Sequence, residues 1–355
     1  MNVTYRIIAP DELDAPLMDA WRAIQSKSNA FASPYFCPEF TRLVGSVRDD
    51  VQVVVIENDA RPVGFFPHQR SLLGMGKPVG GPLSDYHGII AEPGSEWNVA
   101  DLMRSAKLAV WEFDHLVDVS KGFDPYVTAH DSSPQIDLSA GYQQYVGQLR
   151  GQPSDFERKA RKLAREVGEL RFTLHEQASG PMQRLIEWKS EQYRRTSLVD
   201  AFGVRWTGEL LRRIMNVKTA EFAGVCSVLR AGDRIVAVHA GMRSRQVLHW
   251  WFPTYDRAFE KYSPGIILLF RIAEALAATG VHTIDLGKGD DRYKRSVMTG
   301  MVELREGFVE MRSLLARARQ LQRIAAAHAA RGGLAAPLHL PLGAIRRIQW
   351  LRKYR

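Results

Sequence analysis

The segment 261–294 constrains the fold more than any other part of the chain. Pro264 and Gly265 open an amphipathic stretch, and a proline in the first turn of a helix removes no backbone hydrogen bond. Apolar residues recur at helical spacing up to Gly280, which predicts a C-terminal cap. A short strand is predicted at 282–286, and a charged loop follows it. Helix starts expose N–H groups that suit phosphate, and strand ends carry ligand sites in α/β proteins, so the segment predicts such a site.

The sequence contains a strand–turn–strand pattern twice. Predicted strands at 52–57 and 62–68 flank an Asn-Asp turn, and strands at 224–230 and 235–242 flank a Gly-Asp turn. A further antiparallel strand is predicted at 246–252. The prolines in 62–68 favour an edge position for that strand. The repeat is a weak indication of a duplicated fold, because hairpins are common.

A helix with a strongly basic face is predicted between the two halves. Ser154 and Glu157 match a capping box, and Gly168 ends the pattern. The faces outside the apolar stripe carry Arg158, Lys159, Arg161, Lys162 and Arg165. Such a face is either solvated or binds an anionic ligand. Two more helices are predicted at 181–195 and 207–216.

With 355 residues, the chain is long enough for two domains with full cores. We expect an N-terminal domain at 1–150, a C-terminal domain at 151–310 and a basic tail at 311–355. The tail has ten lysine or arginine residues and no acidic residue, while the net charge of the whole chain is +9, so the body is nearly neutral. A neutral body argues against a DNA-binding groove. The tail is a solvated or packed extension, or a peripheral contact with an anionic membrane.

The cellular compartment is indicated by what the sequence lacks. Its start does not match a signal peptide, and its apolar runs are too short to cross a membrane. Cys37 and Cys226 match neither a disulfide framework nor a zinc-ligand spacing. We therefore expect a cytoplasmic protein with structural cysteines. The ten histidines show no metal-ligand spacing either, so we predict no metal.

Together these elements resemble the GNAT superfamily of acyltransferases. More narrowly, they resemble the double-GNAT, FemAB-like branch that includes CelD-type proteins of polysaccharide biosynthesis. The motifs that carry the resemblance are GPLSDYHGII at 81–90, FERKARKLAREVGELRF at 156–172, HWWFPTYD at 249–256, YSPGIILL at 262–269 and IDLGKGDDRYK at 284–294. The resemblance implies a mixed α/β fold of two tandem GNAT-like domains, of which the first is degenerate.

The resemblance also implies that the C-terminal domain binds acyl-CoA across splayed strands, with the pyrophosphate at the next helix start. Tyr262, Ser263 and Gly265 occupy that place. They keep one glycine of the family's Gln/Arg-x-x-Gly-x-Gly/Ala loop. Trp250 and Lys288 are further candidates for binding the cofactor. FemAB relatives can use aminoacyl-tRNA, so the fold leaves the donor open.

Acyl transfer to an amine requires a base, stabilisation of the carbonyl oxygen and departure of the thiolate. Direct attack is favoured, because the chain has no Gly-x-Ser-x-Gly elbow and Cys226 lies in mid-strand. If residues 244–245 form a two-residue turn, His239 pairs opposite Trp250 and shares its face, whereas His249 lies on the other face. We favour His239 as the base, and a hydrogen-bonded core histidine is the alternative.

Three residues near the end of segment 261–294 are further catalytic candidates. Asp285 is a second candidate base, and a cap or ion pair is its alternative role. Tyr293 is a candidate acid for the departing thiolate, because a phenol suits that proton transfer. Lys294 is a candidate to hold a phosphate or to polarise the carbonyl.

The acceptor side is less defined. Asp85, Tyr86 and His87 follow a glycine-rich run and form a candidate substrate-binding loop tip, or an ordinary turn. The residues and the resemblance together predict an N-acyltransferase that uses acetyl-CoA or another acyl-CoA and acts on an amine of a small molecule or a sugar or envelope precursor. Two alternatives stay open. One is a Fem-like aminoacyl-tRNA-dependent transferase, which the neutral body disfavours, and the other is a non-catalytic GNAT-fold accessory protein of polysaccharide biosynthesis.

Overall fold

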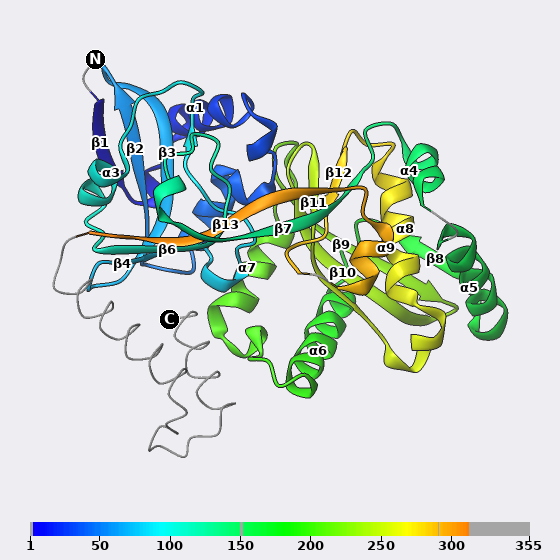
Figure 1. Cartoon of the computed structure of the whole chain (residues 1–355). Helices are drawn as coiled ribbons and strands as arrows, with labels where there is room; N and C mark the ends of the chain where they lie inside the picture. Colours follow the sequence, from blue (N-terminus) through cyan, green and yellow to red (C-terminus); the bar gives the residue numbers. More distant parts are fainter. Residues whose placement is uncertain (1–2, 150–151, 290, 312–355) are drawn as a thin grey trace, which may run out of the picture. The chain divides into compact units, whose positions relative to one another are not determined.

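The computed structural model describes residues 3–149, 152–289 and 291–311, so the predicted basic tail lies outside the described residues except for Met311. The described residues divide into two compact units. Unit 1 comprises 3–31, 41–130 and 304–311, and unit 2 comprises 32–40, 131–149, 152–289 and 291–303. Each unit combines helices with a mixed sheet, which confirms the predicted fold class (Figure 1). The domain boundary at residue 150 stays a prediction.

Unit 1 is built on the strand order β1-β2-β3-β4-β6-β13. Its strands are β1 (Val3–Ile8), β2 (Val51–Asn58), β3 (Arg61–Arg70), β4 (Met75–Lys77), β5 (Ile90–Ala91), β6 (Val110–Leu116) and most of β13 (Gly300–Glu310). Its helices are α1 (Ala15–Gln25), most of α2 (Pro38–Gly45) and α3 (Val99–Ser105).

Unit 2 has the strand order β8-β9-β10-β11-β12-β7. Its strands are most of β7 (Val127–Asp137), β8 (Leu170–Thr173), β9 (Ala223–Ala231), β10 (Arg234–Arg243), β11 (Val247–Tyr255) and β12 (Thr283–Asp285). Its helices are α4 (Tyr142–Gln148), α5 (Gln152–Val167), α6 (Ser179–Arg195), α7 (Arg205–Met215), the 3-10 helix η7 (Arg257–Tyr262), α8 (Pro264–Leu276) and α9 (Arg292–Val297).

The two units repeat the same order of elements. Apart from the 3-10 helices and the two-residue strand β5, each has a strand, two helices, three strands, a helix and a strand: β1-α1-α2-β2-β3-β4-α3-β6 and β8-α6-α7-β9-β10-β11-α8-β12. In each, the first four strands of that series pair antiparallel, the last pairs parallel with the fourth, and an antiparallel strand follows. This match confirms the tandem architecture. The fourth strand has three residues in unit 1 and nine in unit 2, so the region predicted to bind a cofactor is developed in unit 2.

The predicted strands and helices are present with shifted ends, and three local predictions are wrong. Strand β3 is not an edge strand, because β2 flanks it on one side and β4 and β5 flank it on the other. Its prolines are tolerated because β4 and β5 pair only with residues 64–65 and 69–70. Ser154 is not an N-cap, since α5 already includes Gln152. Gly280 does not cap α8, which ends at Leu276, but it adopts a φ of 82° in the turn that follows.

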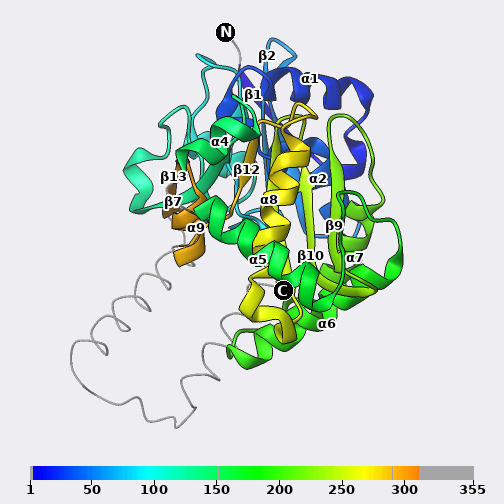
Figure 2. The same cartoon turned by 90° about the vertical axis from the view of Figure 1, so that its right-hand side faces the viewer.

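Helices α5 and α8 share one apolar core with the strands of unit 2. Buried side chains of α8, such as Leu268 and Phe270, pack with Phe156 and Leu163 of α5 and with Leu248 of β11. Figure 2 shows α8 lying along the strands, with α5 beside its first turn. Burying each such side chain stabilises the fold by about 1.5–3 kcal/mol. The core therefore fixes the start of α8 relative to β11.

Both cysteines are buried, and neither forms a disulfide. Burial raises the pKa of the Cys226 thiol to about 11, so it is a poor nucleophile at neutral pH. Within the described ranges, no helix combines the length and apolar character needed to span a bilayer. Those same ranges contain no group of three or more His, Cys, Asp or Glu side chains arranged to hold a metal ion.

Candidate active site

Strands β11 and β12 separate halfway along β11. They pair in parallel only from Val247 to His249, opposite 283–285, and β11 then continues to Tyr255 without β12 beside it. The unpaired half of β11 leads through η7 into α8. A pair of parallel strands that opens in this way leaves backbone groups of β11 available to a ligand.

A β-bulge interrupts β11 at the point where the strands separate. Ala240 pairs with Phe252 but Met242 pairs with His249, so Trp250 and Trp251 both lie opposite Gly241. A Cβ atom on Gly241 would lie 2.3 Å from the carbonyl oxygen of His249 and 2.6 Å from Nε2 of His239. Only glycine therefore allows the strands to approach and the imidazole to lie over the bulge.

The bulge brings His239 and Trp250 together. Their rings stack with centroids 4.3 Å apart. The predicted pairing is wrong, because the hairpin turns one residue later than expected and His239 pairs with Pro253. His239 and Trp250 nevertheless lie on the same face of the sheet, as expected, because the bulge turns the Trp250 side chain toward His239. His249 instead packs against Tyr35, with ring centroids 5.0 Å apart.

The His239–Trp250 pair contains buried polar atoms without partners. Both ring nitrogens of His239 and the indole nitrogen of Trp250 lack a hydrogen bond in good geometry within the described chain. Burial lowers the pKa of His239 to about 3, the His249 carbonyl opposes that shift, and the charges of His249 and Lys189 add to it. The imidazole is therefore neutral at pH 7 and a weak base. Native proteins satisfy nearly all buried polar atoms, so this cluster has the character of a ligand site.

Tyr293 of α9 lies beside Trp250. Burial and the charge of Asp291 raise the pKa of its phenol to about 12, and the Trp250 side chain acts in the opposite direction. The phenol consequently keeps its proton throughout the neutral range. It is a proton donor held next to the bulge.

Lys189 of α6, the helix that packs on β10 and β11, was not predicted from the sequence. It is 9% exposed, and within the described residues it makes no hydrogen bond or close ion pair. Burial lowers the pKa of its ammonium to about 8, Asp291 opposes this, and Lys294 adds to it. The available signal was periodicity: Pro181, Leu185 and Lys189 share the buried stripe of α6, where an apolar residue is expected.

The Lys294 side chain is hydrogen-bonded to the loop that precedes α9. Its ammonium donates to the carbonyl oxygens of Gly287 at 3.0 Å and Lys288 at 2.9 Å, and lies 3.5 Å from Asp291. Lys288 in turn pairs with Asp131 at 3.3 Å. These contacts shape the loop, and the catalytic and phosphate-binding roles of the two lysines stay predictions.

Asp285 is fully buried at the end of β12, and both its oxygens accept hydrogen bonds. Ser133 donates at 2.8 Å, Gln135 at 3.0 Å and the N–H of Gly287 at 2.8 Å. Nδ1 of His249 lies 3.5 Å away. The carboxylate thus ties β12 to β7 and to the loop before α9, and its role as a base stays a prediction.

The start of α8 presents fewer free amides than the sequence suggested. The N–H of Ser263, whose φ is 54°, donates to Glu260, and Pro264 has no N–H. The N–H of Gly265 has no backbone acceptor within the described ranges. Lys159 of α5 brings a cation to this turn, because its ammonium donates to the Ser263 hydroxyl at 3.2 Å while it also pairs with Asp155 at 3.1 Å. The turn therefore combines one free amide, a hydroxyl and a cation.

Tyr262 joins η7 to α5 from a buried position. Its hydroxyl donates to Glu166 at 2.6 Å, and Lys261 lies 3.6 Å from the same carboxylate. These contacts fix the chain reversal between β11 and α8. They give Tyr262 a positioning function, and its predicted cofactor contact is not tested by them.

Asp85, Tyr86 and His87 lie in unit 1. Tyr86 and His87 are buried, and Nε2 of His87 accepts hydrogen bonds from the N–H groups of Asp114 and His115, both at 3.2 Å. Asp85 lies 3.9 Å from the His115 ring. The loop is thus fastened to β6, and its role in substrate binding stays a prediction.

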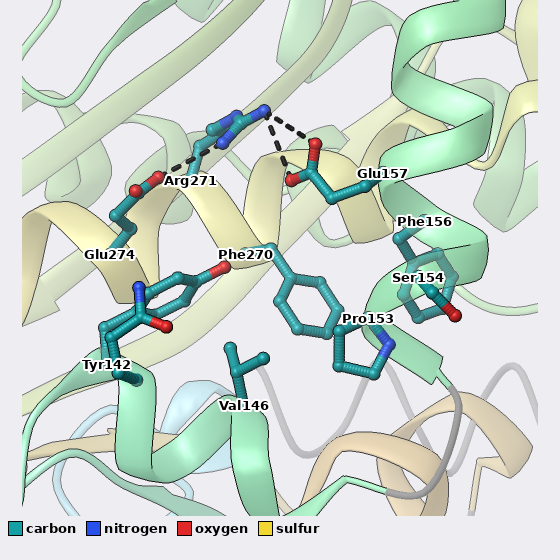
Figure 3. Close-up of a pocket in the computed structure, with 10 residues that line it drawn as sticks. Tyr142, Val146, Pro153, Ser154, Phe156, Glu157, Phe270, Arg271 and Glu274 are labelled. Atoms are coloured by element: carbon teal, nitrogen blue, oxygen red, sulfur yellow. Dashed lines mark hydrogen bonds and ion pairs between the residues drawn. The ribbon is translucent and has the colours of Figure 1, made fainter.

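A separate cavity of about 370 Å³ lies between α4, α5 and α8 (Figure 3). Phe156, Phe270 and Val146 form its apolar wall. Arg271 projects at its rim between Glu274 at 3.1 Å and Glu157 at 3.3 Å. Two carboxylates around one guanidinium leave excess negative charge, which disfavours a diphosphate. None of the predicted site residues lines this cavity.

Comparison with known proteins agrees with this geometry. Residues 152–295 match the family described as acetyltransferase (GNAT) domain. None of the curated proteins matches the chain. The C-terminal domain of a candidate lysylphosphatidylglycerol synthetase from Agrobacterium fabrum is a similar solved structure, with 12% identity, a TM-score of 0.53 and coverage of 86% of this chain and 95% of that one.

Two further solved structures have comparable similarity. A tandem GNAT protein from the clavulanic acid biosynthesis pathway has 9% identity and a TM-score of 0.51, covering 87% of this chain and 98% of that one. FemX has 10% identity and a TM-score of 0.52, covering 76% and 90%. At such identities the likeness concerns the fold alone. Together with the family match over residues 152–295, it shows a tandem GNAT-like fold whose second unit is similar to an acetyltransferase (GNAT) domain.

Proposed function

We propose that the protein is an acyl-CoA-dependent N-acyltransferase whose reaction takes place at the bulge of β11. The observation that carries this proposal is the cluster of His239, Trp250 and Tyr293 beside the separated strands. It combines unsatisfied buried polar atoms with a protonated phenol at an opening of the sheet. A thioester fits there, because its carbonyl needs hydrogen-bond donors and its thiolate needs a proton.

The diphosphate of the donor is assigned to the start of α8. Gly265 supplies an N–H and Ser263 a hydroxyl, and Lys159 of α5 brings a positive charge to the same turn. A helix N-terminus with a nearby cation favours phosphate. From this turn the pantetheine arm follows β11 toward the bulge, where Trp250 and Trp251 lack ladder partners. Their backbone N–H groups are the proposed donors to the thioester carbonyl.

The chemistry is direct attack by an amine on the thioester. The nitrogen–carbon bond forms as the carbon–sulfur bond breaks, and Tyr293 gives its proton to the departing thiolate. His239 is neutral, so it orients the acceptor through a ring nitrogen and does not carry charge. The acceptor is proposed to be an amine on a small molecule or on a sugar or envelope precursor, as in the CelD-type branch.

Binding of acetyl-CoA tests the proposal. Titration calorimetry of the full chain should show one site, and acetyl-CoA should raise the melting temperature by mass action. Acylation of a panel of small amines and amino sugars should then be detected by release of free thiol. A chain that binds neither acetyl-CoA nor longer acyl-CoAs contradicts the proposal.

Lys159→Ala should weaken binding of both acetyl-CoA and free CoA by about 10- to 100-fold, since a hydrogen bond to a charged group contributes about 1.5–3 kcal/mol. Arg165→Ala is the control, because Arg165 lies on the same helix, is 75% exposed and forms an ion pair with Glu166 at 3.8 Å. Calorimetry on the two variants distinguishes the loss of a specific phosphate contact at the start of α8 from the loss of any positive charge on α5. Equal affinities would contradict the assignment.

A second candidate function is transfer from aminoacyl-tRNA. It is favoured by the basic face of α5, where Arg158 and Lys162 are 65% and 46% exposed, and by the shared fold with FemX. It predicts salt-sensitive binding of charged tRNA and no turnover of acyl-CoA. A non-catalytic accessory protein of polysaccharide biosynthesis would show neither. We place the protein in the cytoplasm, with the basic tail as a peripheral contact to the inner face of the membrane.

A further inference from the structure

We infer that Lys189 is the general base that takes the proton from the acceptor amine. This inference rests on the proposed acyl transfer and names the group that makes the amine reactive. It replaces His239 in that role.

Lys189 lies on a helix that covers the strands of the candidate site. Helix α6 packs across β10 and β11, the two strands that carry His239 and Trp250. Lys189 follows Leu185 by one helical turn on the buried stripe of α6, and 91% of its surface is covered. Its charge acts on His239 and is itself influenced by Asp291 and Lys294. Lys189 therefore belongs to the face of α6 that covers the strands of the site.

The Lys189 ammonium has no protein partner among the described residues. Among the described residues, Lys189 has no hydrogen bond and no ion pair within 4 Å, although a buried ammonium is costly unless it is paired. Salt bridges elsewhere in the unit show that lysines on helices do find carboxylates, as Lys159 does with Asp155 at 3.1 Å. A largely buried amine without a partner is explained by a ligand that supplies the contact.

The other titratable groups of the cluster do not suit the role. The His239 ring, with its pKa lowered to about 3, is too weak a base, and Tyr293 keeps its proton. Both oxygens of Asp285 already accept hydrogen bonds, and Lys294 donates to two carbonyls. Lys189, with its pKa near 8, has a neutral fraction at physiological pH that can accept a proton.

The step balances without a further reactant. The neutral Lys189 amine takes one proton from the acceptor nitrogen as that nitrogen bonds to the acyl carbon. The carbon–sulfur bond breaks, and the thiolate receives the Tyr293 proton. The Lys189 ammonium then returns a proton to the phenolate through the site, so one amine and one thioester give one amide and one thiol.

Lys189→Met tests the inference, because methionine fills a similar volume without charge. We expect kcat/KM to fall by about 100- to 10,000-fold, with acetyl-CoA affinity unchanged. The wild-type pH profile should rise through about pH 8, because the base acts when deprotonated, and this limb should vanish in the variant. The melting temperature should stay or increase, since an uncompensated buried cation is removed. Lys162→Met, on the exposed face of α5, should change none of these.

Other outcomes overturn the inference. A Lys189→Met variant that keeps wild-type kcat/KM and the limb near pH 8 excludes Lys189 as the base. If that variant unfolds, Lys189→Arg tests the inference instead. Arginine stays charged and cannot act as a base, so full activity of Lys189→Arg at neutral pH would show that a fixed cation suffices and would exclude Lys189 as the base. A wild-type protein that binds no acyl-CoA refutes the proposed function and this inference together. Acylation at equal rates by wild type and Lys189→Met refutes the inference alone.

Discussion

Tyr293→Phe is expected to lower kcat by about 100- to 10,000-fold while leaving acetyl-CoA affinity at the wild-type value. In the proposed mechanism the phenol is the proton donor for the thiolate, and phenylalanine keeps the ring beside Trp250 but removes the proton. Because the loss concerns a step after binding, kcat and kcat/KM should fall together. Steady-state kinetics with calorimetry on the same samples measures both quantities.

Tyr142→Phe is the matched control for Tyr293→Phe. Burial raises the pKa of Tyr142 to about 12 as well, but this residue lines the cavity between α4, α5 and α8. Its loss should leave kcat unchanged. Equal rates for wild type and Tyr293→Phe would show that solvent protonates the thiolate and would remove Tyr293 from the mechanism.

Gly241→Ala is expected to cause the largest structural effect. The added Cβ would meet the carbonyl of His249 at 2.3 Å and the His239 ring at 2.6 Å, so β10 and β11 must separate or the ring must leave Trp250. Overpacking of this kind costs about 1–3 kcal/mol of unfolding free energy, and more where backbone is the obstacle. Acyl transfer should be lost as well, because the bulge would no longer align its N–H groups.

Urea unfolding measures the stability part of this prediction. Gly208→Ala is the control, because this glycine lies inside α7 with open space around its Cβ position. Alanine there should stabilise by about 0.5–1 kcal/mol. A Gly241→Ala variant as stable and active as wild type would mean that the bulge does not hold the site.

The sequence predicted the elements of unit 2 because their signals are local. Pro264 and the apolar periodicity define α8, and the Gly-Asp turn defines the β9–β10 hairpin. Two similar hairpins also indicated the tandem fold, which the repeated strand order confirms. The degenerate phosphate loop was visible as well, although the sequence alone could not show that Lys159 lies beside Ser263.

The details of the site depend on packing and could not be predicted in the same way. The bulge at Trp250 and Trp251 arises from the contact between two strands, and no local signal marks it. Lys189 looked like one more charged residue on a helix, and only its place on the buried stripe separates it from the others. The edge position expected for β3 failed because two short strands leave its prolines unpaired on one side.

A crystal structure of the full chain with acetyl-CoA, or a non-hydrolysable analogue, tests the central claim most directly. The account predicts the diphosphate against Gly265, Ser263 and Lys159, and the thioester carbonyl against the backbone of Trp250 or Trp251, with sulfur near the Tyr293 hydroxyl. Acetyl-CoA bound elsewhere, for example in the cavity beside Arg271, with the bulge of β11 left unoccupied, would contradict it.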